Sequence, residues 1–271
     1  MTATETTVDS ALAELLIERQ LAGAVRTTRE QSLRYIDRTL TGDTGYTFGL
    51  SDWQDSSVAE LVAATDAAAG DVLTEGDAGT GWISPERVID GIHRHADALR
   101  RPLREGGVSV LLATGHPMGL LDHYAELARA LRAAGNRVLQ PLDNHMLTHD
   151  TPEHRAGTSG IRFICGVACA FENEAILHTH RPDYMTAMLQ DLSATGQRVD
   201  LVIADHGMAG AAIEAGLETL SIADVNDSAL MLAQHRGRHH HLLCVEDNLP
   251  PAQFHPVTEH LLSLAHTSAL G

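Results

Sequence analysis

The chain has 271 residues, of which 44% are hydrophobic and only 4% aromatic, so its core must consist mainly of Leu, Ala, Val and Ile. A formal net charge of −17 argues against nucleic acid or an anionic membrane as a partner. The same field repels anionic substrates, so a phosphate-binding site would need a metal ion or local donors. The length fits one large α/β domain, or one domain with a helical appendage.

The three cysteines, Cys165, Cys169 and Cys244, form no paired framework, and an odd number fits a reducing cytosol. The spacing of the first two, without a second pair, favours buried structural thiols over a zinc cage. The acidic, Thr-rich N-terminus has no signal pattern, and no apolar run reaches membrane length. We therefore expect a soluble, cytoplasmic protein.

The first hundred residues show helical patterns and no strand-like alternation. Apolar residues at helical spacing over 9–40 predict two helices broken near Thr27. The connection over 41–57 contains aromatic residues, which we expect to pack on the main body as a lid or staple. Two further helices are predicted to begin just after Ser57 and Ser84, because serine is a favourable N-cap residue.

Short apolar runs between turn residues, separated by helical segments, fill the rest of the chain and predict βαβ units. The clearest unit runs from a buried strand over 201–204, through a small-residue helix, to a strand over 219–223. Further strands are predicted over 108–113, 137–140, 161–171, 175–177 and 241–245, and further helices over 120–134, 182–195, 228–235 and 257–265.

The expected fold class is therefore α/β, with a mostly parallel, Rossmann-like sheet flanked by helices and an N-terminal helical region. Residues 1–105 are expected to form a helical cap or wrap, and residues 106–271 the α/β catalytic domain, with one compact domain overall as the alternative. The helical region could serve as a lid, as the interface of a homodimer, or as both.

Six of the predicted strands end in His, Asp or Asn. Chance would scatter these residues over both ends, whereas right-handed crossovers would place all six ends on one side of the sheet. We therefore predict an active site at this edge. The six segments are Thr114-Gly115-His116, Asp143-Asn144-His145, His178-Thr179-His180, Asp205-His206-Gly207, Asp224-Asn226-Asp227 and Asp247-Asn248.

The chemistry of this edge is narrowed by what the sequence lacks. It has no Walker-type phosphate loop, no D-x-D-x-T, no cysteine-phosphatase loop, no G-x-S-x-G and no dinucleotide motif. Carboxylates, amides and imidazoles remain, and these are ligands for a divalent cation. Mg²⁺ or Mn²⁺ is the first expectation, with Zn²⁺ or Fe²⁺ as alternatives.

Individual residues have both a structural and a functional interpretation. His178 and His180 project to the same side of an extended segment, a common arrangement of metal ligands, although H-x-H alone is a weak motif. Asp205 follows four apolar residues and should lie at the sheet edge as a ligand or catalytic group. Asp227 best fits a plain helix N-cap. His116 could brace a turn or contact phosphate.

These residues also resemble a known family. V-L-L-A-T-G-H-P-x-x-L-L-x-x-Y, H-T-H-x-P, A-D-H-G, I-A-D-x-x-D-x-A-L and E-D-N occur in the order in which an actinobacterial family of phosphatases carries similar motifs. The resemblance covers most of 108–256 and, more weakly, T-T-R-E-x-x-L-R over 27–34. Arg181, Asn226 and Asn248 replace a serine and two aspartates of the family, which could change the metal number or the substrate.

The resemblance implies a hydrolase acting on small phosphorylated metabolites. Carried over by position, it points to His116, His178, His180, Asp205, His206, Asp224, Asp227 and Asp247.

The leading hypothesis is a metal-dependent phosphatase, a phosphoric monoester hydrolase acting on a sugar phosphate or a nucleoside monophosphate. His116 or His206 would be the general acid, with Asp205 as a further catalytic candidate. The candidate metal ligands are Asp205, Asp224, Asp227, Asp247, His178 and His180, and the candidate phosphate contacts are Thr114, Gly115, Arg26, Arg29 and Arg181.

Two alternatives remain open from the sequence. A metal-dependent lyase or isomerase would use the same ligands to polarise a carbonyl of a sugar phosphate. A non-catalytic protein would bind a phosphorylated metabolite without turnover. The arginines themselves have a plainer interpretation as parts of solvated helix faces.

Overall fold

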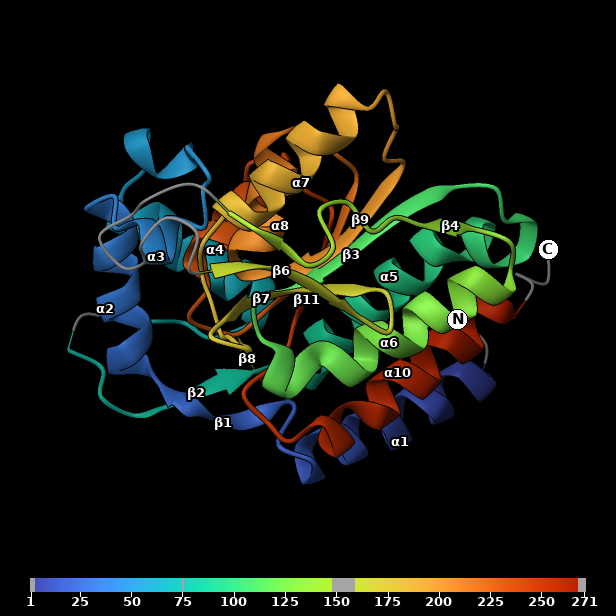
Figure 1. Ribbon diagram of the computed structural model, residues 1–271. Helices are drawn as coiled ribbons and strands as arrows, with labels where there is room; N and C mark the ends of the chain where they lie inside the picture. Colours follow the sequence, from blue (N-terminus) through green and yellow to red (C-terminus); the bar gives the residue numbers. More distant parts are fainter. Residues whose placement is uncertain (1–2, 75, 148–158, 268–271) are drawn as a thin grey trace.

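The computed structural model describes residues 3–74, 76–147 and 159–267 (Figure 1). The helices are α1 (Ala3–Glu18), α2 (Arg29–Leu40), α3 (Thr44–Thr47), the 3-10 helix η1 (Asp52–Asp55), α4 (Val58–Ala69), α5 (Pro85–Glu105), α6 (Pro117–Ala133), α7 (Asp183–Ala194), α8 (His206–Glu214), α9 (Ser228–His235) and α10 (Pro251–His266). The strands are β1 (Gly23–Thr28), β2 (Thr80–Ile83), β3 (Ser109–Thr114), β4 (Arg137–Val138), β5 (His145–Met146), β6 (Ser159–Ile164), β7 (Val167–Glu172), β8 (Ala175–Ile176), β9 (Leu201–Asp205), β10 (Thr219–Ala223) and β11 (His241–Cys244).

One large sheet has the strand order β11-β10-β9-β3-β7-β6-β5, with β4 beside β3 and β8 beside β7. The strands from β11 to β7 are parallel, and β5, β6 and β8 add antiparallel pairs. Every residue of β9 and β10 is buried, as expected for strands covered on both faces. The predicted α/β class with a largely parallel sheet is confirmed.

The direction of winding reverses between β3 and β9. From β3 the chain passes through α6 to β4 and later β7, on one side of β3. It then returns through α7 to β9, on the other side of β3, and continues outward through β10 to β11. Ligands of open parallel sheets bind at such a switch point, outside the carboxyl ends of the strands.

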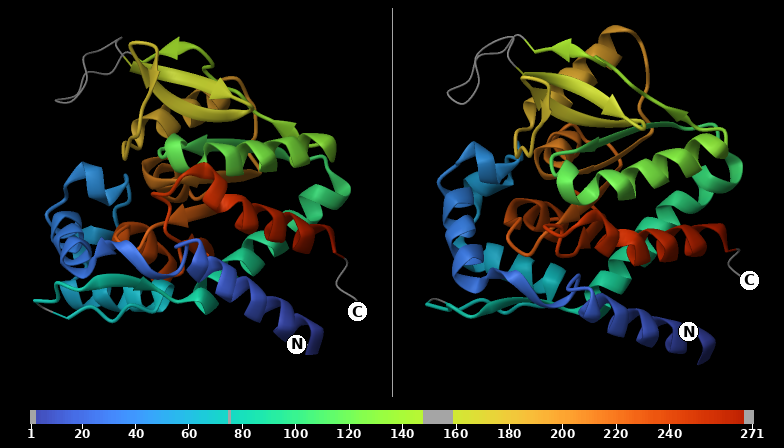
Figure 2. Two further views of the ribbon diagram at one scale, coloured as in Figure 1. Left: turned by 90° about the horizontal axis from the view of Figure 1, so that it is seen from below. Right: turned by 60° about the horizontal axis from the view of Figure 1, so that its bottom comes forward.

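Helices cover both faces of the sheet (Figures 1 and 2). α5, α6 and α10 pack against one another on one face, and α7 and α8 pack together on the other. α1 lies along α5 at the outside of the first layer, and α4 packs on α9. The interior is aliphatic, with Tyr124 and Tyr184 among its largest fully buried side chains. None of the described helices is long and apolar enough to cross a membrane.

The N-terminal region is not purely helical. β1 and β2 form an antiparallel ribbon, although the sequence predicted no strand in the first hundred residues. The apolar pattern over 9–40 belongs to α1 and α2, and the alternation between them in G-A-V-R-T-T is short and has one large apolar residue, Val25. The predicted caps Ser57 and Ser84 are confirmed, because each side chain accepts a hydrogen bond from the first turn of its helix.

The predicted strand over 161–171 is a hairpin. β6 and β7 are joined at Cys165 and Gly166, whose φ angles of 52° and 97° suit a tight turn. Cys165 is exposed and Cys169 is buried, so the expectation of buried thiols for this pair is wrong for Cys165 and confirmed for Cys169. α10 begins at Pro251, before the start predicted from the apolar pattern.

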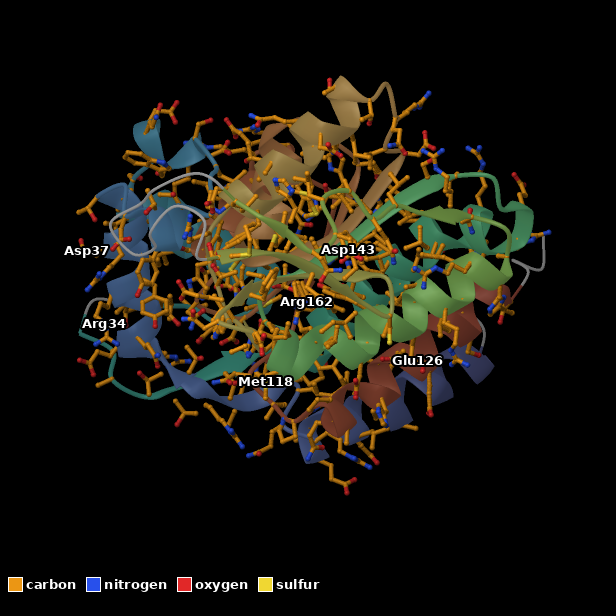
Figure 3. All side chains as sticks on the ribbon, viewed as in Figure 1. Arg34, Asp37, Met118, Glu126, Asp143 and Arg162 are labelled. Carbon is orange, nitrogen blue, oxygen red and sulfur yellow. The ribbon has the colours of Figure 1, made fainter. Side chains whose placement is uncertain are left out.

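One of the six predicted polar strand ends, the segment 143–145 after β4, does not lie with the other five. β4 has only two residues, and the segment after it leads to β5 at the far edge of the sheet. Asp143 accepts a hydrogen bond from the backbone N–H of Phe163 at 2.9 Å, and Asn144 accepts one from Arg162 at 3.2 Å. Asp143 and Arg162 are labelled in Figure 3. This segment therefore braces the β6–β7 hairpin.

Candidate active site

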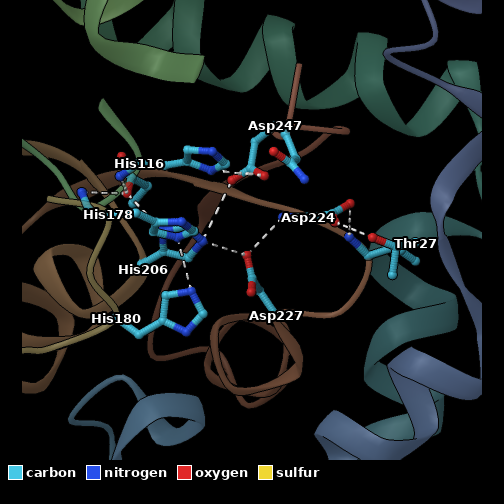
Figure 4. Close-up of polar contacts among 12 residues, drawn as sticks. Thr27, His116, His178, His180, His206, Asp224, Asp227 and Asp247 are labelled. Atoms are coloured by element: carbon cyan, nitrogen blue, oxygen red, sulfur yellow. Dashed lines mark hydrogen bonds and ion pairs between the residues drawn. The ribbon is translucent and has the colours of Figure 1, made fainter. Parts of the chain in front are cut away.

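A cavity of about 140 Å³ lies at the carboxyl ends of the strands beside the switch point. It combines side chains that follow four strands of the large sheet and the hairpin segment after β8 with side chains from β1 and α2 (Figure 4). The lining residues are Thr27, Gln31, Tyr35, His116, His178, His180, His206, Asp224, Asn226, Asp227, Asp247 and Asn248.

Asp205 joins the ends of the two strands at the switch point. Its Oδ1 accepts hydrogen bonds from the backbone N–H groups of Gly115 and His116, at 2.7 and 3.1 Å. A Cβ on Gly115 would lie 2.3 Å from the carbonyl oxygen of Thr179, so this close approach requires glycine. Asp205 is fully buried behind the cavity and is absent from its lining. It therefore holds the turn that presents His116.

Thr114 and Gly115, the predicted phosphate contacts, both form hydrogen bonds that hold this turn together. The Thr114 hydroxyl accepts the backbone N–H of His116 at 2.9 Å, and the N–H of Gly115 is donated to Asp205. Burial raises the pKa of Asp205, and the Thr114 hydroxyl and the neighbouring His116 oppose that rise. Neither Thr114 nor Gly115 lines the cavity.

Four imidazoles gather on one side of the cavity. The rings of His116 and His178 are stacked with centroids 4.4 Å apart, and those of His180 and His206 with centroids 4.5 Å apart. The buried ring of Phe48 lies 5.3 Å from that of His180 and 5.6 Å from that of His206. The aromatic connection over 41–57 thus packs against the site, as expected from the sequence.

The backbone fixes the tautomer of His180. Its Nδ1 lies 2.8 Å from the carbonyl oxygen of Gly45, which can only accept, so Nδ1 carries the proton. Its Nε2 therefore presents a lone pair, 3.2 Å from Nε2 of His178. Such a second-layer hydrogen bond is the usual way in which a protein orients a ligand histidine.

His206 is held in a strained conformation. Its φ of 45° lies in the left-handed region, which side-chain-bearing residues seldom adopt and which recurs at functional sites. Its Nδ1 lies 3.1 Å from Asp205, and its Nε2 lies 3.6 Å from Asp227 Oδ2 and 3.7 Å from Asp247 Oδ2. In this conformation one ring nitrogen of His206 faces the carboxylates of Asp227 and Asp247 (Figure 4).

The opposite side of the cavity is acidic and buried. Asp224 accepts a hydrogen bond from the Thr27 hydroxyl at 2.7 Å, and Glu246 accepts one from the backbone N–H of Arg26 at 3.0 Å. Asp227 precedes α9, but it caps no N–H of that helix and accepts the backbone N–H of Asp224 at 2.9 Å. Asp227 therefore occupies the N-cap position, as predicted, but its carboxylate does not cap the helix.

Crowding of these carboxylates changes their protonation. Burial, followed by the charges of neighbouring carboxylates, raises the pKa values of Asp224 and Asp227 well above the usual range. The pKa of Glu246 is raised as well, again mainly by burial. A positive charge among these groups would relieve the repulsion that raises their pKa values.

The four histidines fall into two electrostatic types. Burial and repulsion by other imidazoles lower the pKa of His206 to about 3, and desolvation and the same repulsion lower that of His178 to about 4. The pKa of His180 is also lowered, mainly by burial. Burial opposes protonation of His116 too, but Asp247, 3.4 Å from its Nδ1, outweighs that effect and raises its pKa. His116 is therefore the imidazole best suited to carry a proton.

None of the three arginines predicted to clamp phosphate lines the cavity. The side chain of Arg26 is exposed, and only its backbone N–H reaches the acidic cluster. Arg29 forms an ion pair with Asp71 at 2.8 Å, and Arg181 pairs with Asp183. The chain contains no lysine. Among the described residues that line the cavity, the only side chains that can carry positive charge are imidazoles.

The donor atoms of this site fit a divalent cation. Three groups place one donor atom of each member within 4.8 Å of the others: His116 with His178 and His206, His206 with Asp227 and Asp247, and Asp224 with Glu246 and Asp247. Asp247 Oδ2 is buried and has no hydrogen-bond partner among the described residues. Burying an unpartnered carboxylate oxygen beside imidazole lone pairs is costly unless a cation or a proton lies between them.

The structure thus brings together seven of the predicted site residues at the cavity, and places Asp205, Thr114 and Gly115 directly behind them. Glu246 was not predicted, although it precedes Asp247 in the same strand-end segment. Thr27 and Gln31 were not predicted as site residues either, although both fall within the weaker stretch of family resemblance over 27–34.

Fold and site together define an α/β protein with a cavity lined by imidazoles and carboxylates at the switch point of a largely parallel sheet. The family model described as Phosphatase matches residues 7–269, and the chain belongs to that family. A Streptomyces coelicolor protein named phosphatase SCO2771 is 34% identical over 260 residues, which cover 94% of this chain and 95% of that protein. No solved structure matches the chain. The expected resemblance to an actinobacterial phosphatase family is confirmed.

Proposed function

We propose that this protein is a metal-dependent phosphomonoesterase that releases inorganic phosphate from a small phosphorylated metabolite. Membership of the Phosphatase family supports the reaction. The observation that carries metal dependence is the charge of the cavity, which has three aspartates and neither arginine nor lysine among its lining residues. A phosphate dianion would be repelled there unless a cation neutralised the carboxylates first.

The size of the cavity supports recognition of a phosphoryl group. Its volume of about 140 Å³ is well below the roughly 300–1,000 Å³ of pockets that enclose whole ligands. The rest of the substrate would therefore lie at the mouth, where Gln31, Tyr35 and Asn248 offer neutral polar groups. Such groups suit the hydroxyls of a sugar phosphate or of a nucleoside monophosphate.

His206, Asp227 and Asp247 would hold one ion, and Asp224 with Glu246 could complete a second position that shares Asp247. A mixed set of imidazole and carboxylate favours Mn²⁺, Fe²⁺ or Zn²⁺ over Mg²⁺, which prefers oxygen ligands alone. When bound, such an ion would neutralise the phosphate and favour ionisation of the attacking water. Because the pKa of His206 is lowered to about 3, this imidazole is neutral and able to act as a ligand near pH 7.

His116 would be the general acid. Its pKa is raised by Asp247, whose carboxylate also orients the ring from 3.4 Å. A protonated imidazole at the cavity can donate to the oxygen of the departing alcohol. Asp205 would act as a positioning residue, because it fixes both the turn that bears His116 and the Nδ1 side of His206.

The test is a panel of sugar phosphates and nucleoside monophosphates incubated with protein that contains Mn²⁺, Fe²⁺, Zn²⁺ or Mg²⁺. Free phosphate and the organic product are measured separately. Release of phosphate with an otherwise intact alcohol as the second product supports the proposal. A rearranged or cleaved carbon skeleton without phosphate release would instead indicate a lyase or isomerase, and binding without any product would indicate a metabolite-binding protein.

A further inference from the structure

A second cluster of donors lies outside the candidate active site. Asp9 on α1, His93 on α5 and His260 on α10 each place one donor atom within 4.8 Å of the other two. α1 and α10 both pack against α5. None of these three residues lines the active-site cavity. Residues far apart in the sequence thus converge on one point between three helices.

The geometry of the cluster resembles a metal site with open positions. Asp9 Oδ1 lies 3.6 Å from Nε2 of His93, and the rings of His93 and His260 are nearly parallel, 25° apart, with centroids 6.4 Å apart. Two donors of a tetrahedral zinc ion with bonds of about 2.0–2.1 Å are separated by about 3.4 Å. The carboxylate and the first imidazole therefore have the spacing that a shared ion needs.

Two ring nitrogens in the cluster make no hydrogen bond to a described residue, although one of them faces Asp9 at ion-pair distance. Nε2 of His93 and Nε2 of His260 are both buried and have no hydrogen-bond partner among the described residues. Buried polar atoms of folded proteins are nearly always satisfied, so each exception requires an explanation. The His93 side chain as a whole is 43% exposed, which leaves an approach from solvent for an ion.

We propose that Asp9, His93 and His260 bind a Zn²⁺ ion that fastens α1 to α5 and α10. Two imidazoles and one carboxylate suit Zn²⁺, with water in the remaining position, and do not suit Mg²⁺ or Ca²⁺. α1 is otherwise anchored by a few apolar side chains, among them Leu12 and Leu16. This proposal does not rest on the proposed phosphatase reaction, because the three ligands lie outside the cavity.

The ion would also act on a segment that reaches the active site. α1 leads through the buried Leu21 into β1, and β1 carries Thr27, which holds Asp224. The carbonyl of Leu21 accepts the backbone N–H of Glu246 at 3.1 Å. Fastening α1 therefore restrains the strand that supports the acidic side of the cavity.

The test compares wild type with the double variant His93→Ala/His260→Ala after equilibrium dialysis against Zn²⁺, with bound zinc counted by atomic emission. His255→Ala, which removes an exposed histidine from α10, is the matched control. We expect the double variant to bind one Zn²⁺ per chain fewer than wild type and the control variant. Counting the difference removes the contribution of ions in the active site.

Hydrogen exchange supplies the second readout. With Zn²⁺ at about 100 times its Kd, exchange of α1 amides in wild type should slow about 100-fold, and the double variant should show no such change. If the double variant fails to fold, Asp9→Asn takes its place, because it alters one side chain only. This variant should weaken zinc protection of α1 at least tenfold. Equal zinc content in wild type and double variant, or α1 exchange that ignores Zn²⁺ in wild type, would overturn the proposal.

Discussion

The carboxylate of Asp247 lies 3.4 Å from Nδ1 of His116. This contact makes the protonation of His116 differ from that of the other three imidazoles of the site. Asp247 raises the pKa of His116, whereas burial lowers the pKa values of His180 and His206. Only one ring of the stack is therefore suited to carry a proton, and the others are suited to bind a cation.

His116→Gln should slow the hydrolysis of alkyl phosphates, such as sugar phosphates, by about 10²–10⁴-fold, because a positioned acid contributes that much to loss of a poor leaving group. An aryl phosphate such as p-nitrophenyl phosphate departs without protonation and should be slowed far less. Steady-state phosphate release with both substrates measures the ratio. Equal losses on the two substrates would show that His116 is not the acid.

Thr27→Val should lower kcat/KM by about tenfold or more, because a buried carboxylate, Asp224, would lose its hydroxyl donor. Arg26→Gln should change kcat/KM by less than about twofold, because only the backbone of Arg26 contacts the site. Assaying the two adjacent variants side by side provides the comparison. A larger loss in Arg26→Gln would restore that arginine as a phosphate contact.

Asp227→Asn should stabilise the metal-free protein at pH 8 by at least about 1 kcal/mol, because the pKa of Asp227 is raised by burial and by neighbouring charges. A raised carboxyl pKa means that the folded state binds more protons than the unfolded state, so stability of the metal-free protein is lost as pH rises toward the folded pKa.

The same variant should lose the stabilisation that a metal gives wild type, which is about 2.7 kcal/mol at 100 times Kd. Urea unfolding with and without Mn²⁺ measures both effects. An Asp227→Asn protein that is weaker than wild type without metal, yet equally stabilised by Mn²⁺, would remove Asp227 from the metal site.

Acid should destabilise the fold through histidines outside the site. Burial lowers the pKa of His95 to about 4, and those of His123 and His239 to about 3. Their unfolded values are near 6.5, so the unfolded chain binds more protons below that pH. Their contribution to stability is complete above pH 6.5 and is lost as pH falls toward the folded values, by up to about 1.4 kcal/mol per pH unit for each histidine.

His123→Gln keeps a polar group facing the hydroxyl of Thr258 and removes one of these titrations. The free energy of unfolding, measured in urea between pH 6 and pH 4.5, should then depend less steeply on pH than in wild type, by about one proton. An unchanged slope would mean that His123 titrates normally in the folded state.

The strand ends that form the site could be predicted because each is marked by a local sequence pattern. In β3, β9, β10 and β11 a buried apolar run ends abruptly in polar residues, and parallel strands place such ends together. The ribbon of β1 and β2 was missed because G-A-V-R-T-T shows little hydrophobic alternation. Its position depends on distant contacts such as that between Arg26 and Glu246.

The ion-pair partners of the arginines could not be predicted, since they depend on which side chains the fold brings together. Arg29 bonds to Asp71 across 42 residues of sequence, and Arg181 bonds to Asp183, two residues after it. The role of Asp205 also depends on tertiary structure, because its bonds to Gly115 and His116 span 90 and 89 residues of sequence. A sequence pattern identifies the reactive groups of this edge, and only the folded structure distinguishes lining residues from supporting ones.

The most direct test of the central claim is phosphate release from protein stripped by a chelator and then titrated with Mn²⁺ or Zn²⁺. Wild type and Asp97→Asn, a control that changes an exposed aspartate of α5, should be inactive when stripped and should regain activity saturably with metal. Asp247→Asn should stay inactive at the same metal concentrations. Full activity of the stripped wild type, or equal recovery in Asp247→Asn, would contradict a phosphatase whose cation is held by Asp247.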